Sequence, residues 1–433
     1  MPETENKEFL SFSRNMLLQC GILFGVICAG LWINKYFMVI AAAFTVITAL
    51  CGKMEYCFYQ LFFTLPFSMV YKLSPASTSL FAYTMLAVGA VLIVRQWSFE
   101  SDFIVFFAAT AMYLIIGMNG NHTIAVKMIF GLCLFYIFVK RILPADFKNH
   151  IMAFSLGMLG SSCIGLLKGN WLRIDAYYSD MNSIYIGGVK SLRFSGLYLD
   201  PNYYSISAIF AITLCIMLFI SKRGNKILLG TVIGALTVFG FISYSKMFLI
   251  AISALALILI ISGLRSLKKI LIVIFSAPII GTAIYKWMLN NNYITTMTGR
   301  FSGRDISTGR FGLWKTYTEY INHSITTLLF GDGLGAGYLS VGGPHNTYIE
   351  AIYFIGLLGT ALFLITTFIV FKCRRLDIKR SILNYTLPLL FMFIIATLGC
   401  FTINDLMFYL ILIWVGLNYN INGEKQAIDK QYI

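Results

Sequence analysis

One of the four histidines stands where a polar loop gives way to a long apolar run, in "VGGPHNTYIE" (341–350). An imidazole titrates at about 6.5, so His345 could accept a hydroxyl proton near neutral pH. Glu350 lies about one and a half helical turns further on and could orient or tune a group beside it, with Asn346 as a neighbouring polar contact. The alternative is that His345 only caps the apolar helix whose start Pro344 marks.

Three arginines form a second candidate group. Arg300, Arg304 and Arg310 each follow a glycine within "TGRFSGRDISTGRFGLW" (298–314). A guanidinium presents a flat fork of donors, so two or three of them could hold a pyrophosphate and neutralise the charge that develops on it. The alternative is a solvated face, or attraction to lipid headgroups.

Two further cations stand close to apolar runs. Arg193 lies in "KSLRFSGLYLDPNYYS" (190–205), where Pro201 and Asn202 are ordinary signals for a helix start and leave the arginine unexplained. Lys246 occupies a short turn in "ISYSKMFL" (242–249). This lysine could face the same anion as the arginines, or reach the membrane surface from a helix end. We treat Arg193 as a pyrophosphate ligand, with Lys246 and Asn202 as further candidates for substrate binding.

The residues after Arg310 predict the helix that would position it. Apolar and aromatic side chains recur every three or four residues, at Phe311, Trp314, Tyr317, Ile321, Ile325 and Leu328. Ser307 or Thr308 would cap this helix, and "GDGLGAG" (331–337) would stop it. A helix with Trp and Tyr on its face, beside a membrane, is expected to lie in the interface. Arg310 would then lie at the helix amino terminus, where free amides and the helix dipole favour an anion.

The chain as a whole is far more apolar than a water-soluble protein. Hydrophobic residues make up 58% of its 433 residues and charged residues 12%, and the mean hydropathy is +0.79. Soluble domains keep roughly 25% charged residues to cover their surface, so lipid must be the solvent here. We expect an all-α fold, a single integral membrane domain over residues 1–433 with no cleaved signal peptide and about 12–14 spans. The apolar runs are 15–33, 36–51, 57–71, 77–94, 103–118, 122–139, 151–167, 203–220, 227–243, 247–263, 270–288, 346–371, 381–399 and 404–419.

The positions of the basic residues explain the net charge of +15. With the amino terminus in the cytoplasm, about 20 of the 33 lysines and arginines fall in cytoplasmic segments, and both termini are then cytoplasmic. Nucleic-acid binding gains no support from this distribution. Most of the other cations cluster in two long extracytoplasmic loops, 168–202 and 290–345, and long loops on an otherwise minimal bundle are where function is expected.

Other chemistries lack their motifs. The sequence contains no Asp-x-Asp, no His-x-x-x-His, no phosphate-binding P-loop and no Gly-x-Ser-x-Gly. We therefore expect neither a metal nor a cofactor. Nucleotide sugars are cytoplasmic, whereas the candidate residues are predicted outside. A donor there would more plausibly be a lipid that carries its own pyrophosphate leaving group.

The sequence resembles the superfamily of O-antigen ligases and polymerases, which build bacterial envelope glycans. The resemblance covers residues 190–375, and the first seven apolar runs match only in being hydrophobic. The matching segments are "RFSGLYLDPNYYS" (193–205), "SK" (245–246), "STGRFGLW" (307–314), "GDGLGAG" (331–337) and "PHNTYIEAIYFIGLLG" (344–359). Each is short, so the resemblance depends on their order, spacing and common outer location.

Members of this superfamily are metal-independent transferases that act on undecaprenyl-pyrophosphate-linked glycans at the outer face of the cytoplasmic membrane. By resemblance, Arg193 and Arg310 handle the pyrophosphate, and His345 is the base that acts on the acceptor hydroxyl. Lys246 stands where the family has an arginine, so the charge is kept but the bidentate fork is lost. The arginines at 300 and 304 have no firm counterpart in the resemblance.

The resulting expectation is a surface-polysaccharide polymerase of the bacterial inner membrane, an inverting glycosyltransferase with a periplasmic active face. Its partners would be the lipid-linked glycan donor, the glycan acceptor, membrane lipid, and a flippase and chain-length regulator of the same pathway. Two alternatives stay open: an O-antigen ligase that moves the glycan to lipid A core, and a flippase for the same lipid-linked sugars. Transporters place functional charges within spans, whereas here only Lys127 is clearly mid-span.

Overall fold

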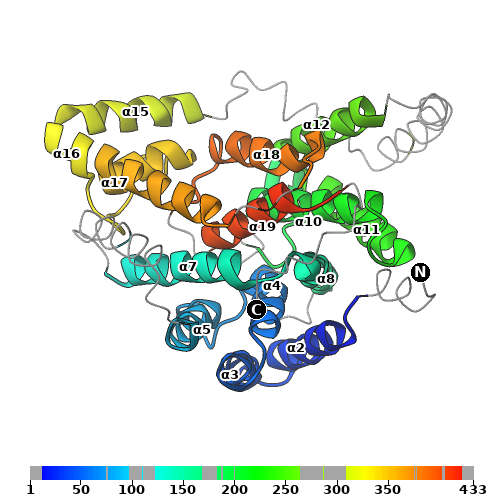
Figure 1. Cartoon of the computed structure of the whole chain (residues 1–433). Helices are drawn as coiled ribbons and strands as arrows, with labels where there is room; N and C mark the ends of the chain where they lie inside the picture. The colour runs from blue at the N-terminus through cyan, green and yellow to red at the C-terminus, as the bar shows by residue number, and fades with distance from the viewer. Residues whose placement is uncertain are drawn as a thin grey trace.

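The computed structural model describes residues 12–74, 77–96, 110, 122–167, 183–186, 189–198, 200–263, 286, 309–374, 376, 378–401 and 405–421, with the backbone alone in the two strands. This part of the chain is helical apart from one short hairpin (Figure 1). The α-helices are α2 (Arg14–Trp32), α3 (Tyr36–Cys51), α4 (Met54–Thr64), α5 (Leu80–Gln96), α7 (His122–Arg141), α8 (Phe147–Leu166), α10 (Pro201–Ile220), α11 (Lys226–Ile242), α12 (Lys246–Gly263), α15 (Arg310–His323), α16 (Ile325–Phe330), α17 (Thr347–Lys372), α18 (Thr386–Ile395) and α19 (Leu406–Asn418). Short 3-10 turns are η1 (Leu65–Phe67), η2 (Pro144–Asp146) and η3 (Ile382–Tyr385).

The helices occupy the predicted apolar runs. The runs 103–118 and 270–288 lie outside the described residues. Elsewhere each run holds a helix, which confirms the all-α class for the part of the chain that the structure describes. Three of these helices, α2, α10 and α17, are long and apolar enough to cross a membrane, and six other apolar segments are 10–17 residues long.

A two-stranded hairpin interrupts the first predicted loop. Strands β1 (Ser183–Ile186) and β2 (Val189–Leu192) pair antiparallel, with Ile186 opposite Val189. The sequence between them is Gly187-Gly188, a pair typical of two-residue hairpin connections. The hairpin lies within the loop predicted over 168–202, and β2 leads directly into Arg193.

Helix α10 is the most enclosed of the three long helices. Over its most apolar 18 residues 78% are buried, against 28% in the corresponding stretch of α2. It packs against α8, α11 and α12, and also against α18 and α19. Figure 1 accordingly shows α10 at the centre of the molecule. Because close-packed interiors resist deformation, the residues at the start of α10 have a rigid support.

Helix α17 is bent, although its sequence is one continuous apolar run. Gly356 has φ 65° and ψ −179°, so α17 consists of two helical segments joined at this residue. The amides of Asp332 and Gly333 donate to the carbonyl oxygens of Tyr353 and Phe354, both at 2.8 Å. A loop that follows α16 thus satisfies the carbonyl groups that the bend removes from the helical ladder.

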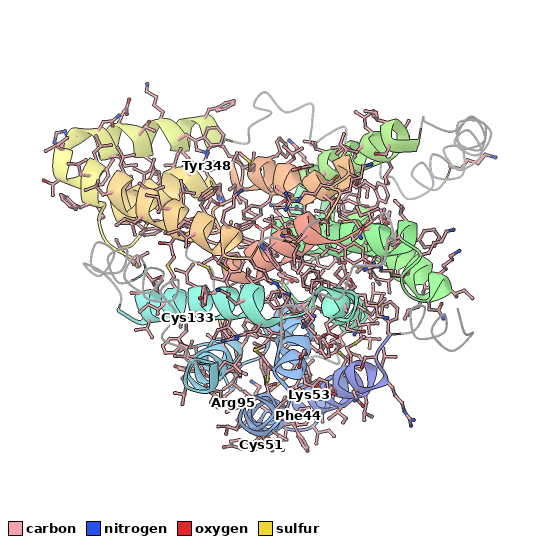
Figure 2. All side chains as sticks on the ribbon, viewed as in Figure 1. Phe44, Cys51, Lys53, Arg95, Cys133 and Tyr348 are labelled. Atoms are coloured by element: carbon pink, nitrogen blue, oxygen red, sulfur yellow. The ribbon has the colours of Figure 1, made fainter. Side chains whose placement is uncertain are left out.

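Several helices meet at one end of the molecule, which we call the basic end (residues 49–53, 95, 140–149, 223–226, 372–374, 376, 378–380 and 417–419). Arg95 donates to the carbonyl oxygens of Ala49 and Gly52 at the end of α3. Arg374 donates to Ile142 at 2.7 Å, just beyond the end of α7. Figure 2 shows Arg95 beside Cys51 and Lys53.

Arg380 repeats this arrangement at the end of α19, where it donates to the carbonyl oxygen of Leu417 at 3.0 Å. The same guanidinium reaches the side chain of Asn418 at 3.0 Å. The last carbonyl groups of a helix lack intrahelical donors and carry partial negative charge. Arginines that were expected only to set the orientation in the membrane therefore also bond the carbonyl groups at helix ends.

Candidate functional site

The opposite end of the molecule gathers the predicted site residues, and we call it the site end (residues 193–202, 242–246, 309–317, 338–350 and 396–401). Helices α10, α12, α15 and α17 begin here. Tyr348, in the first turn of α17, is labelled in Figure 2 on the far side of the molecule from Arg95 and Lys53. Loops that were far apart in the sequence therefore share one surface.

The carboxylate of Asp200 caps α10. Its Oδ1 accepts from the amide of Asn202 at 2.6 Å, and Pro201 is the first helical residue. The predicted helix start is confirmed, but the cap is Asp200 rather than Asn202. This leaves the side chain of Asn202 available for other contacts.

Arg193 is held beside that asparagine. Its Nη2 donates to Oδ1 of Asn202 at 3.3 Å, and its Nε donates to the carbonyl oxygen of Ser243 at 3.2 Å. Gly196 has φ 55°, and a Cβ there would meet the ring of Tyr204 in α10 at 3.0 Å. This segment also crosses α8 closely, because a Cβ on Gly165 of α8 would lie 2.7 Å from the Cα atom of Gly196. Two neutral acceptors therefore help to orient the guanidinium.

Lys246 begins α12, directly after the turn that holds Arg193. Tyr244 in this turn has φ 49°, and Ser245 donates to Oδ1 of Asn202 at 2.9 Å. The Ser245 hydroxyl also accepts from the amide of Phe248 at 3.4 Å, so it caps α12. Lys246 therefore directly follows Ser245, which bonds Asn202. The same asparagine bonds Arg193, so the three segments lie close together.

Arg310 is the first residue of α15, as predicted. The residue before it is Gly309, with φ 84°, and no side chain caps the helix. Gly309 therefore stands at the cap position, whereas the predicted caps Ser307 and Thr308, like Arg300 and Arg304, lie outside the described residues. The first amides of a helix lack intrahelical acceptors, so this is the end of α15 that favours an anion.

The predicted amphipathic helix is two helices. Ser324 is extended and caps α16 by accepting from Thr327 at 3.4 Å, so α15 ends at His323. Tyr317 and Ile321 are buried, whereas the predicted apolar positions Phe311 and Ile325 are 67% and 68% exposed. The apolar face is therefore only partly covered by the rest of the chain.

Two aromatic residues of α15 bind the loop that contains the histidine. Trp314 donates from Nε1 to the carbonyl oxygen of Pro344 at 2.9 Å. The hydroxyl of Tyr317 donates to the carbonyl oxygen of Gly342 at 2.8 Å and accepts from the amide of Leu339 at 3.0 Å. Sequence reasoning missed this role, since it placed Trp314 and Tyr317 at a membrane interface.

His345 does not cap the following helix. Asn346 is the cap of α17, and its Oδ1 accepts from Tyr348 and Ile349 at 3.0 and 3.2 Å. His345 itself has φ 47°, a left-handed conformation that is uncommon outside glycine, and the residue is only partly covered by the rest of the chain. The cap interpretation of the histidine is therefore wrong, and Asn346 is assigned to the helix rather than to a substrate.

Three charged or titratable groups from three segments act on one another at this surface. Burial lowers the pKa of His345, the guanidinium of Arg310 lowers it further, and the carboxylate of Asp200 opposes them by raising it. Burial also lowers the pKa of Arg310, and the same carboxylate raises it. Asp200 was not predicted as a site residue, although its position before Pro201 marked it as a helix start. At neutral pH the imidazole is uncharged and can accept a proton.

Glu350 connects two segments that lie next to the site. It is buried, accepts from the Tyr338 hydroxyl, and accepts from the amide of Phe401 at 3.0 Å. The turn that contains Phe401 is also joined to α10, because the Tyr203 hydroxyl donates to the carbonyl oxygen of Gly399. Glu350 thus bonds Tyr338 and Phe401, which identifies it as a structural brace instead of a partner of the histidine.

The arrangement combines a helix start that carries Arg310 with a partly exposed imidazole whose pKa is lowered. Among the described residues, no group of three or more His, Cys, Asp or Glu side chains could hold a metal ion. No family model matches the sequence, and no curated protein or solved structure matches it.

Proposed function

We propose that this chain is an integral membrane glycosyltransferase that joins lipid-pyrophosphate-linked oligosaccharide repeats, a surface-polysaccharide polymerase. The observation that carries the proposal is that α15, which begins at Arg310, is bonded through Trp314 to the carbonyl oxygen of Pro344 beside His345, and that the charges of Asp200 and Arg310 act on the imidazole. A guanidinium at a helix amino terminus suits a pyrophosphate, and a partly exposed, uncharged imidazole beside it suits an acceptor hydroxyl.

In this proposal the basic end faces the cytoplasm. The positive-inside rule favours that orientation, because the arginines of the basic end lie in short connections between helices. The site end then faces the extracytoplasmic side of a bacterial inner membrane, with both termini in the cytoplasm and about 12–14 spans. Arg300 and Arg304 belong to the second outer loop and would add to the anion site.

The reaction breaks one bond and forms one. The acceptor hydroxyl oxygen attacks the anomeric carbon of the donor sugar while His345 takes the hydroxyl proton. The bond between that carbon and the pyrophosphate oxygen breaks, and the electron pair leaves with the pyrophosphate. Arg310 and Arg193 would bind the additional negative charge, which needs no metal. Attack opposite the leaving group inverts the anomeric configuration.

Purified protein in detergent tests this function directly. The assay supplies a lipid-pyrophosphate-linked oligosaccharide as donor and acceptor, and measures the joined product. His345→Ala and Arg310→Ala should each lower the rate by roughly 10²–10⁴-fold. Two matched controls lie on the same helix: His323→Ala and Lys315→Ala change exposed residues of α15 and should keep the rate.

Two outcomes would reject the proposal. Full activity of His345→Ala would show that His345 is not the base. Absence of product with any lipid-linked repeat would reject the transferase and favour transport. Product formed in detergent, without a sealed membrane, excludes a role in transport alone.

A genetic experiment separates polymerase from ligase. In a strain with an intact glycan pathway, deletion of a polymerase leaves single repeats on the final acceptor. Deletion of a ligase instead leaves long chains on the lipid carrier. The polymerase proposal expects the first result.

A further inference from the structure

One face of α15 carries three residues that the site uses. Arg310, Trp314 and Tyr317 are spaced by four and three positions, so they lie in a row along the helix. Tyr317 has no exposed surface, which shows that this face is turned toward the rest of the chain.

The two aromatic residues bind the 338–346 loop in register. Tyr317 bonds the carbonyl oxygen of Gly342, and Trp314, one turn nearer the start of α15, bonds that of Pro344. Residues nearer the start of α15 therefore bond residues further along the loop. The next position on the same face is Arg310, and the next residue of the loop is His345.

The loop needs this support because its backbone is strained. His345 has φ 47°, and Pro344 before it has a carbonyl group whose orientation the Trp314 indole fixes. On the other side, Asn346 is fixed as the cap of α17. An unfavourable backbone conformation persists only where its surroundings determine it.

We propose that Trp314 and Tyr317 are positioning residues, whose hydrogen bonds to the carbonyl groups of Pro344 and Gly342 set His345 against Arg310. The consequence for catalysis rests on the proposed function, whereas the register of α15 on the loop does not. In an enzyme that depends on this pair, a small displacement of the helix separates the anion site from the base.

The test follows the ionisation of His345 in the full-length protein. Protein with carbon-13-labelled histidine contains only four signals, and His345→Gln assigns one of them. The variants Trp314→Phe and Tyr317→Phe remove the donors and keep the rings. Tyr320→Phe is the matched control, because the Tyr320 hydroxyl on the same helix bonds Asp332 at 2.7 Å, away from the 338–346 loop.

The expected result is a rise in the pKa of His345 toward the ordinary value in Trp314→Phe, because the imidazole moves away from Arg310. The signals of the other histidines should stay in place, which shows that the variant is folded. In the transfer assay, kcat should fall about 10- to 100-fold while the KM for donor changes less. Tyr320→Phe should match the unchanged protein in both measurements.

An unchanged His345 titration in both Trp314→Phe and Tyr317→Phe overturns the inference, whatever happens to the rate. A shifted titration in a protein that makes no glycan product supports the positioning role and rejects the proposed function. The two claims therefore fail separately.

Discussion

Arg193 donates from Nη2 to Oδ1 of Asn202 at 3.3 Å. The same oxygen accepts from the Ser245 hydroxyl at 2.9 Å, so Asn202 joins the segment before α10 to the start of α12. Both bonds use Oδ1, which therefore already has two donors. The structure therefore favours Asn202 as a residue that orients Arg193, whereas the sequence suggested that it binds substrate.

Asn202→Ala should weaken binding of the lipid-linked donor without unfolding the protein. The Arg193 guanidinium loses one of its two described acceptors, so we expect a KM for the lipid-linked donor that is about 10-fold higher. The transfer assay with varied donor measures this change. Asn225→Ala is the matched control, because Asn225 caps α11 at the basic end and its loss should lower stability alone. An unchanged KM in Asn202→Ala would show that Arg193 needs no such support.

The transfer rate should resist moderate acid. The imidazole of His345 accepts a proton only when uncharged, and burial and Arg310 lower its pKa below the usual value of about 6.5. The rate should therefore persist through pH 6.5 and fall as the pH drops through the lower, folded-state pKa. The unfolded chain binds this proton at higher pH than the folded chain, so stability should also decrease below about pH 6.5.

Asp200→Asn should move the acid limb of the rate to still lower pH. The carboxylate of Asp200 raises the pKa of His345, and asparagine removes the charge while remaining a good helix cap. The pH dependence of kcat/KM in the two proteins measures the displacement. A limb that stays in place, or moves to higher pH, would mean that Asp200 does not act on the base.

Gly356→Ala should strongly destabilise the protein. The bend of α17 requires φ 65° at this position, and a Cβ there would collide with the backbone of Leu329 and Phe330. We expect a loss of about 3–5 kcal/mol, seen as a lower melting temperature in detergent. Gly312→Ala is the control, because a Cβ at Gly312 meets nothing within 4 Å and α15 should gain about 0.5–1 kcal/mol. Equal melting temperatures for the two variants would contradict the bend.

Arg374→Lys should separate orientation from helix capping. Lysine keeps the positive charge that sets orientation but cannot reproduce the guanidinium bond to the carbonyl oxygen of Ile142. Stability should fall by about 1 kcal/mol while cysteine labelling from either side of the membrane gives the same topology. Arg14→Lys, at an exposed residue with no described bond, should leave the melting temperature unchanged. A reversed topology in Arg374→Lys would show that capping is not its main contribution.

Local patterns in the sequence were sufficient for the helices. Apolar runs, the Pro201 signal and the glycine-rich stop after Phe330 all act within a few residues of where they stand, so they predict α10, α17 and the end of α16. The Gly187-Gly188 hairpin was equally readable and was overlooked. Arg310 was correctly predicted as a helix start, although its cap was not.

Contacts between distant segments had no local signal. Asp200, Arg310 and His345 influence one another although they stand 110 and 35 positions apart in the numbering, and nothing near any of them specifies the other two. Packing decided that Glu350 braces a distant turn and that Trp314 bonds the carbonyl oxygen of Pro344.

The sequence alone determined an apolar helical chain with its cations gathered in particular loops, because hydropathy and charge are properties of each residue and its neighbours. The tertiary structure alone decided which of those cations faces which titratable group. That choice depends on how α10, α15 and α17 pack, and close packing over many side chains is a property of the whole fold.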